Sequence, residues 1–361
     1  MSVRGYTDKE FNRDLKWDQP LTSGVNFRIL TSAEKVTFIS PRISQRTLDN
    51  CLEDFRPDVA IMTAYSKLFW LDAYYWVFRN KTRLVMRTEA SDVAGQRGRL
   101  KSQLRDLLLR NLYKRVDAFC VIGNEADNHF RRLGVPKQKR FRSPYCVDTD
   151  MFEEQYQRLL PKRYKLRKAL GINRGDKVLI FSGKLVARKN PLLLLKSLEM
   201  LPTKLRDKTH LLAIGDGEVK GAFCRSAAKI LGARFHYQGF LNQSELGEAY
   251  TIADILVLPS ARGFHETWGL VVNEAMQFGC MVIASDAVGC HTDLVDQEVG
   301  RIFNAGNAEQ LKERIMELSS LSVEDLERAS VIARMKVSLF SSQDAIDGIV
   351  EAVHHAKHCC N

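Results

Sequence analysis

ADILVLPSARGFHETWGLVVNEAMQFG (residues 253–279) joins a short apolar strand to a helix through a polar loop. The helix is predicted to begin near Gly269 and Leu270, where free backbone N–H groups suit a diphosphate. Glu266 and Glu274 lie eight positions apart. On a helix this spacing is a little over two turns, so both carboxylates can lie on one face. The alternative is that both are surface glutamates of an amphipathic helix.

FSGKLVARKNPLLLL (residues 181–195) is predicted to be a strand that ends at Gly183, followed by a loop and a helix. The loop carries Lys184 and Lys189. Ligands of open α/β sheets bind at the carboxyl ends of the strands, so two cations there could neutralise a leaving diphosphate. A lysine-rich surface loop is the alternative.

A second predicted strand, HLLAI (residues 210–214), runs into a turn made of Gly215, Asp216 and Gly217. Glycine in such a turn lets a ligand approach the backbone closely. The triplet is a weak signal by itself, and its weight comes from its place between the other two segments.

Short apolar runs alternate with helix-length segments along the chain, which predicts an α/β fold with mostly parallel sheets covered on both faces. Residues 152–170 are charged and helical without a strand, so we expect a domain boundary there. The predicted domains are residues 1–160 and 161–340, with a cleft between them. A last helix in residues 341–361 is expected to pack back on the first domain.

The strand predictions rest on apolar runs bounded by polar or turn-forming residues. These runs lie at residues 25–30, 35–40, 59–65, 83–89, 118–123, 141–147, 177–183, 210–217, 233–240, 253–260 and 281–286.

The composition is that of a folded chain of two ordinary domains, with 361 residues, 45% hydrophobic and 27% charged. No apolar run approaches the roughly 20 residues that span a bilayer, and the polar start predicts no secretory signal. We therefore expect a cytoplasmic protein. The eight cysteines form no C-x-x-C pair, so neither a zinc site nor a thioredoxin motif is indicated.

The net charge of +11 lies mostly in the first part of the chain. Residues 1–160 hold 28 Lys and Arg against 20 Asp and Glu, which leaves +8 there and +3 in the remainder. One interpretation is a solvated surface. The other is attraction to the anionic phosphates of a membrane surface or a lipid-linked acceptor, with peripheral contact at the cytosolic face. No nucleic-acid motif is present. The densest basic cluster comprises Arg131, Arg132, Lys137, Lys139, Arg140 and Arg142.

In this order, the loop with two lysines, the glycine turn and the segment with two glutamates resemble the retaining glycosyltransferases of family four (glycosyl transferases group 1). The resemblance is close over residues 175–315 and looser in the first half. It implies the GT-B fold, with two Rossmann-like domains facing a central cleft. It also implies transfer of a hexose, with retention, from a UDP- or GDP-sugar to a saccharide or lipid-linked acceptor. No metal and no cofactor beyond the nucleotide-sugar co-substrate are implied.

The resemblance also implies residue roles. Lys184 and Lys189 match the basic pair that holds the donor diphosphate, and Glu266 matches the glutamate that faces the transferred sugar. Glu274 matches the glutamate that binds the nucleotide ribose. Catalytic roles are thereby expected of Glu266, Lys189 and Lys184. The residues expected to line the donor through their backbone are Gly183, Gly215, Gly217, Gly269, Leu270 and Val271.

The start of the chain departs from the family pattern. A strand, a glycine-rich loop and a helix usually open the first domain, and by domain size about 50–70 residues are expected to be missing. This departure raises a second hypothesis. The chain would then be a truncated or degenerate GT-B protein that binds a nucleotide sugar or a partner without catalysis.

The acceptor side is predicted less sharply. Family members often carry a histidine at the end of the strand that matches residues 59–65, where this chain has Thr63 and Tyr65. Arg87 and Glu89 end the next predicted strand, either as a buried ion pair or as acceptor contacts.

Overall fold

The computed structural model describes residues 6–8, 13–15, 26, 45–63, 68–90, 92, 99–264 and 266–358. The predicted strands at residues 25–30 and 35–40, apart from Asn26, and the predicted site residue Tyr65 lie outside the described residues. Two short strands near the start, β1 (Tyr6–Asp8) and β2 (Arg13–Leu15), pair antiparallel and were not predicted.

The first large sheet has four parallel strands in the order β3-β4-β5-β6. Each strand begins a unit in which a helix follows, and this alternation is why the chain crosses over between parallel neighbours. The elements are β3 (Val59–Met62), β4 (Arg83–Met86), β5 (Ala118–Val121), β6 (Arg140–Arg142), α1 (Gln45–Phe55), α2 (Leu68–Arg79), α3 (Arg99–Tyr113) and α4 (Asn124–Arg132).

The second sheet has six parallel strands in the order β12-β11-β10-β7-β8-β9. The chain runs outward from β7 in one direction to β9, and then returns to build the other half from β10 outward. The point where the order reverses therefore lies between β7 and β10, which is where ligands of such sheets bind. The strands are β7 (Lys177–Ser182), β8 (Thr209–Ile214), β9 (Phe235–Gly239), β10 (Ile255–Leu258), β11 (Met281–Ser285) and β12 (Gly300–Phe303).

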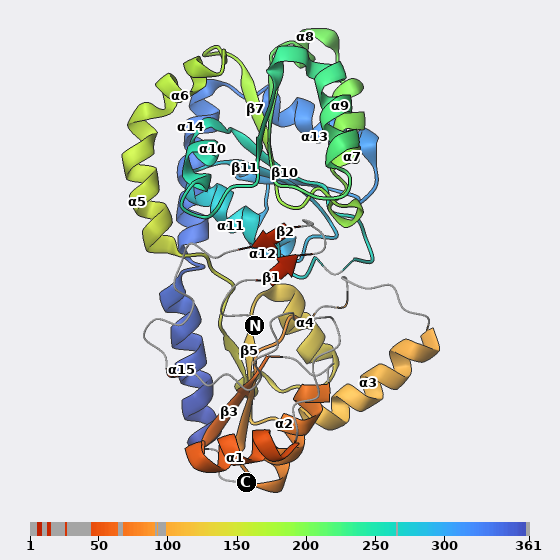
Figure 1. Ribbon diagram of the computed structural model, residues 1–361, viewed down its shortest axis with the longest axis vertical. Coiled ribbons are helices and arrows are strands. Elements are labelled where there is room, and N and C mark those ends of the chain that lie inside the picture. Colours follow the sequence, from red (N-terminus) through yellow and green to blue (C-terminus); the bar gives the residue numbers. More distant parts are fainter. Residues whose placement is uncertain are drawn as a thin grey trace.

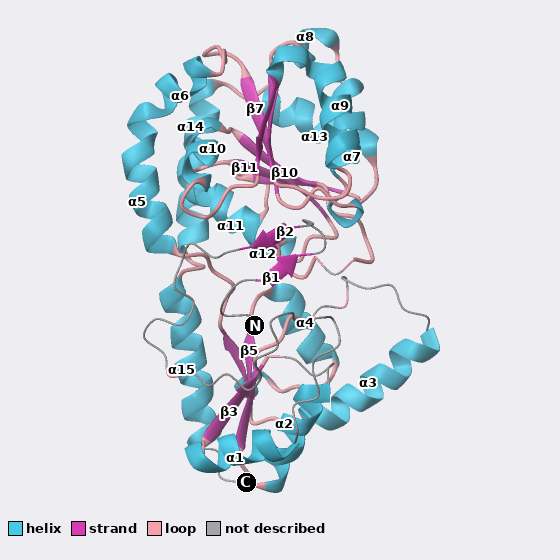
Figure 2. Cartoon of the chain, in the orientation of Figure 1, coloured by secondary structure: helices cyan, strands magenta, loops and turns pink. Residues whose placement is uncertain are grey.

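Helices cover both faces of this sheet, as burial of β8, β10, β11 and all of β7 after Lys177 requires. One apolar core lies under α7, α9 and α13, and the other under α5, α10, α11 and α14 (Figure 2). These helices are α5 (Thr149–Leu159), α7 (Pro191–Glu199), α9 (Lys220–Leu231), α10 (Leu246–Ile252), α11 (Leu270–Gln277), α13 (Ala308–Ser319) and α14 (Val323–Ser338); the shorter helices are α6 (Arg163–Ala169), α8 (Thr203–Arg206) and α12 (His291–Leu294).

The last helix, α15 (Ser342–His358), lies against the first sheet rather than the second (Figure 1). Ala352 and Ala356 pack with Val85 and Cys120 of the first sheet. A Cβ on Gly348 would lie 1.8 Å from the carbonyl oxygen of Arg142, so only glycine permits this approach. None of the described helices combines the length and apolar character needed to cross a bilayer.

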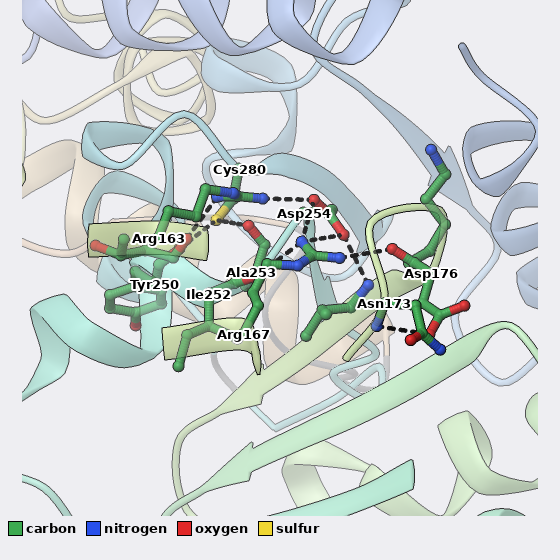
Figure 3. A network of polar contacts seen from close by, with 12 residues as sticks. Arg163, Arg167, Asn173, Asp176, Tyr250, Ile252, Ala253, Asp254 and Cys280 are labelled. Carbon is green, nitrogen blue, oxygen red and sulfur yellow. Dashed lines mark hydrogen bonds and ion pairs between the residues drawn. The ribbon is translucent and has the colours of Figure 1, made fainter. Parts of the chain in front are cut away.

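A buried carboxylate ties α6 to the start of the second sheet (Figure 3). Asp254, whose side chain is 10% exposed, accepts hydrogen bonds from Arg163 at 2.5 Å and from Arg167 at 3.0 Å. It also accepts one from the backbone N–H of Val178 at 2.7 Å. Arg167 in turn donates to the carbonyl oxygen of Asp176 at 2.6 Å. The Asp254 carboxylate thus holds α6, the helix that leads into the second domain, against the start of β7.

We expect Asp254→Ala to lower the free energy of unfolding by about 3 kcal/mol, because it leaves two partly buried guanidinium groups without their partner. Asp207→Ala is the matched control, since Asp207 pairs with Arg234 at a more exposed position and should cost less than about 0.5 kcal/mol. Denaturant unfolding measures both. Equal losses in the two variants would show that the Asp254 network does not anchor the domain.

Candidate active site

The loops that follow β7 and β8 pack backbone against backbone. Gly215 has φ +125°, and a Cβ there would lie 1.8 Å from the carbonyl oxygen of Gly183. The N–H of Gly183 donates to the carbonyl of Ile214 at 3.1 Å, and the N–H of Leu185 donates to that of Asp216 at 2.9 Å. Only glycine fits at position 215. The contact leaves Lys184, half-buried, at the carboxyl end of the central strand.

Gly217, the second glycine of the turn, lies against the same loop. A Cβ on Gly217 would lie 2.5 Å from the carbonyl oxygen of Leu185. The carbonyl oxygen of Leu185 also accepts from the N–H of Val219 at 3.0 Å. The turn that follows β8 therefore packs against the loop that carries Lys184 and Lys189.

Lys189 points inward although it lies in a loop rich in basic residues. It ends a 3-10 turn, Ala187–Lys189, and Asn190 follows in the left-handed region with φ +50° before Pro191 opens α7. The side chain of Lys189 is only 10% exposed, and its ammonium group forms an ion pair with Glu266. The interpretation of this segment as a plain surface loop is therefore wrong for Lys189.

Glu266 lies in the loop between β10 and α11. Its carboxylate accepts from the hydroxyl of Ser260 at 3.2 Å and lies 3.9 Å from the guanidinium of Arg188. The expectation that Glu266 and Glu274 share one helix face is wrong, because α11 begins only at Leu270. Gly269 has φ +102°, which is not a helical conformation, so the residues before it form a loop. This loop, and not the spacing along a helix, brings Glu266 to Lys189.

Glu274 is buried beneath this loop, in the second turn of α11. The residue is 9% exposed, and its carboxylate accepts from the hydroxyl of Tyr250 at 2.7 Å. The Tyr250 oxygen also lies 2.9 Å from the hydroxyl of Ser182, at the end of β7. Burial raises the pKa of Glu274, while the Tyr250 hydrogen bond and the charge of Lys189 act in the opposite direction. Lys189 therefore couples the two carboxylates electrostatically.

The first turn of α11 faces the same region. Gly269 is the N-cap residue, without a side-chain cap, and Leu270 and Val271 are the first helical residues. Backbone N–H groups at this position have no carbonyl partner within the helix, and the helix dipole adds positive potential. The arrangement is suited to an anion, in agreement with the charge of the two lysines nearby.

The first domain contributes Glu89 to the edge of the site. Its carboxylate accepts from the hydroxyl of Tyr145 at 2.5 Å and from the hydroxyl of Thr267 at 2.8 Å. Thr267 adjoins Glu266, so this bridge links the two domains beside the site. Arg87 turns away, with its guanidinium 5.0 Å from the Tyr145 ring centre and its Nε donating to Ser143 at 3.3 Å. The interpretation of Arg87 and Glu89 as a mutual ion pair does not hold.

The predicted acceptor-side residue Thr63 and the buried histidine of α4 make none of the contacts described above. Thr63 follows β3 and is exposed. His129 of α4 is fully buried, 2.8 Å from Asp92 and 3.1 Å from the hydroxyl of Tyr113, so it packs inside the first domain.

Several residues of the cluster were not predicted from the sequence. Apart from Arg188, they have small or aromatic side chains whose sequence patterns are those of ordinary core or loop residues, and only their contacts distinguish them. They are Ser182, Arg188, Tyr250, Ser260, Tyr145 and Thr267.

This chain is similar to known glycosyltransferases in both sequence and fold. Residues 162–335 match the family model "Glycosyl transferases group 1". The chain is 28% identical over 186 residues to the D-inositol 3-phosphate glycosyltransferase of Xylanimonas cellulosilytica, covering 49% of this chain and 42% of that protein. It is 27% identical over 238 residues, covering 66% and 52%, to the N,N'-diacetylbacillosaminyl-diphospho-undecaprenol alpha-1,3-N-acetylgalactosaminyltransferase of Campylobacter jejuni. The chain thus spans about half or less of the length of these relatives.

The fold is also that of solved glycosyltransferase structures. The structure of Anabaena HepE in complex with UDP and glucose superposes with a TM-score of 0.63 at 16% identity, covering 86% of this chain and 81% of that one. A glycosyltransferase from Rickettsia africae superposes with a TM-score of 0.66 at 15% identity, covering 87% and 81%. The predicted GT-B architecture of two Rossmann-like domains is confirmed.

The burial of Glu274 has a consequence for stability. Its pKa is raised above the ordinary value of about 4.5, so folding favours the protonated form. The stability that this preference contributes is present below pH 4.5 and is lost as the pH rises through the folded-state pKa. We expect Glu274→Gln to gain stability relative to the wild type as the pH rises above about 4.5.

Urea unfolding at several pH values measures this difference, and Glu309→Gln, at an exposed position on α13, is the control. A stability difference between wild type and Glu274→Gln that does not change with pH would contradict the expected titration.

Proposed function

Because residues 162–335 match the glycosyl transferases group 1 family, we propose that the chain is a glycosyltransferase. It moves a hexose from a UDP- or GDP-sugar to a saccharide or lipid-linked acceptor, with retention and without a metal ion. The observation that carries the proposal is the convergence of Lys189, Glu266 and Glu274 where the strand order of the second sheet reverses.

The donor diphosphate lies between the lysine loop and the first turn of α11 in this proposal. Lys184 and Lys189 supply positive charge, and Leu270 and Val271 supply backbone N–H groups. These groups stabilise the charge that develops when the sugar–phosphate bond breaks. Glu266 then exchanges its contact with Lys189 for the hydroxyls of the transferred sugar.

The transfer itself is proposed as a front-face displacement. The bond between the anomeric carbon and the phosphate oxygen breaks, and the acceptor oxygen bonds to the same face of that carbon. The acceptor hydroxyl gives its proton to the departing phosphate oxygen, so no separate base is required. Glu274, buried beside Tyr250, binds the nucleotide ribose.

The acceptor side belongs to the first domain, where Glu89 faces Thr267 across the edge of the site. The Campylobacter relative carries a diphospho-undecaprenol acceptor in its name, which supports a lipid-linked acceptor here. A basic first domain, with +8 of the net charge in residues 1–160, supports peripheral contact with an anionic membrane on the cytosolic side.

We expect Glu266→Gln to lower the rate of hexose transfer by a factor of about 100 or more, because the amide cannot supply the charge that faces the sugar. Binding of UDP or GDP should change little, since the proposed contact is with the sugar. Transfer of radiolabelled sugar from a panel of UDP- and GDP-sugars measures the rate, with Glu309→Gln as the control. Nucleotide-sugar binding without transfer by the wild type would favour the second hypothesis, a non-catalytic binding protein.

We expect Lys189→Ala to weaken the binding of UDP or GDP by a factor of about 10–100, the loss typical of a charge-assisted contact. Calorimetry measures the affinity, and Lys312→Ala, a surface lysine of α13, is the control. Because Lys189→Ala also removes the nearest cation of Glu266, the double variant Lys189→Ala/Glu266→Gln separates the two effects. Unchanged nucleotide affinity in both variants would contradict the diphosphate role.

A further inference from the structure

Helix α3 carries a stripe of leucines on its outer face. Leu109 and Tyr113 of the same helix are buried in the core of the first domain, so the helix is firmly seated by its other side. Counted from Leu100, the exposed leucines lie at the first, fifth, eighth and ninth positions, which places them on one helix face. They are Leu100 (82% exposed), Leu104 (60%), Leu107 (56%) and Leu108 (61%).

Basic residues border this leucine stripe on both sides. At 100° per residue, Lys101 falls along one border and Arg110 along the other, where Lys114 follows directly after the helix; all three are exposed. The single acidic residue of the helix, Asp106, lies on the opposite side, where it pairs with Arg132. The outer face of α3 therefore combines apolar and positively charged groups without a carboxylate of its own.

The position of α3 makes this face accessible. Figure 1 shows α3 at the edge of the first domain, with its N-terminal end directed away from the sheet. The exposure of Leu100, the largest of the four, agrees with that view. A helix of 15 residues is about 22 Å long, long enough to lie along a surface.

Helix α14 also carries an exposed apolar pair, but the charges around it differ from those around the leucines of α3. Val331 and Met335 of α14 are 58% and 67% exposed. At 100° per residue, Glu324, Glu327 and Arg328 fall on the same face as this pair, so this face carries a net charge of −1. An anionic surface would attract the face of α3 and repel that of α14.

We propose that α3 binds the surface of an anionic bilayer, lying in the interface with its leucines at the acyl boundary and Lys101, Arg110 and Lys114 at the lipid phosphates. The leucine stripe supplies the buried apolar area, and the flanking cations supply the preference for anionic lipid. This assigns the peripheral membrane contact of the proposed function to a particular helix. It rests on that proposed function, in which membrane binding brings the first domain to a lipid-linked acceptor. Vesicle binding is measured without any transfer reaction, so failure of either proposal is seen separately.

The test is sedimentation of the full chain with vesicles of phosphatidylcholine, with and without phosphatidylglycerol. We expect the wild type to bind the anionic vesicles and Leu104→Gln/Leu108→Gln to bind them about tenfold more weakly or worse. Glutamine is chosen because it keeps helix propensity. The matched control, Val331→Gln/Met335→Gln, removes the same kind of exposed apolar pair and should bind as the wild type does.

The charge component is tested by Lys101→Gln/Lys114→Gln. We expect binding to phosphatidylglycerol vesicles at low salt to weaken about fivefold for each lysine removed, with a smaller salt dependence than in the wild type. Unfolding midpoints and UDP affinity should stay unchanged in all these variants, which excludes a loss of folding as the cause.

Three outcomes would overturn the proposal. The first is a wild type that does not bind anionic vesicles, and the second is equal loss of binding in the α3 and α14 variants. The third is vesicle binding that survives Leu104→Gln/Leu108→Gln while size-exclusion chromatography shows a dimer becoming a monomer, which would make a second copy of the chain the occupant of the stripe.

Discussion

The ion pair between Lys189 and Glu266 holds the site together. It joins the loop after β7 to the loop after β10, the two strands between which the order of the second sheet reverses. A lysine as buried as Lys189 is costly to desolvate, and a nearby carboxylate offsets that cost. The positive φ angles of Asn190 and Gly269 shape the two loops so that these side chains lie within ion-pair distance. A polyanionic ligand would be a stronger partner for the lysine than Glu266, so the pair is a suitable resting arrangement for a diphosphate site.

Two glutamates of the same segment have different surroundings, and this difference separates their chemistry. Glu266 faces a cation at the edge of the site, whereas Glu274 is buried and held by the neutral hydroxyl of Tyr250. Pairs of carboxylates in contrasting environments are a common way to give two acidic groups two roles. The backbone contact between Gly183 and Gly215 supports both, because it fixes the end of β7 from which Ser182 reaches Tyr250.

The first domain meets this site through few but specific contacts. Glu89 bonds to Thr267, next to Glu266, and the carboxylate of Asp293 accepts from the backbone N–H of Asn124 at 3.0 Å, at the start of α4. A carboxylate from one domain thus caps a helix of the other, where the helix dipole favours negative charge. Helix α15 follows the second domain in the chain and packs against the first sheet, which adds a further link between the two domains.

The local pattern of the sequence determined the alternation of strands and helices and the glycine turns. It was also enough to single out the basic and acidic candidate site residues of the second domain. Those features depend on neighbours along the chain. Strand β12 was not predicted, because Gly300 and Arg301 dilute its apolar pattern at the edge of the sheet. Tertiary structure alone decided that Lys189 is buried, that Glu266 pairs with it, and that the Tyr250 hydroxyl donates to Glu274. Each of these outcomes depends on which loops converge at the switch point, and the burial, the pairing and the pKa of a side chain follow from residues far away in the sequence.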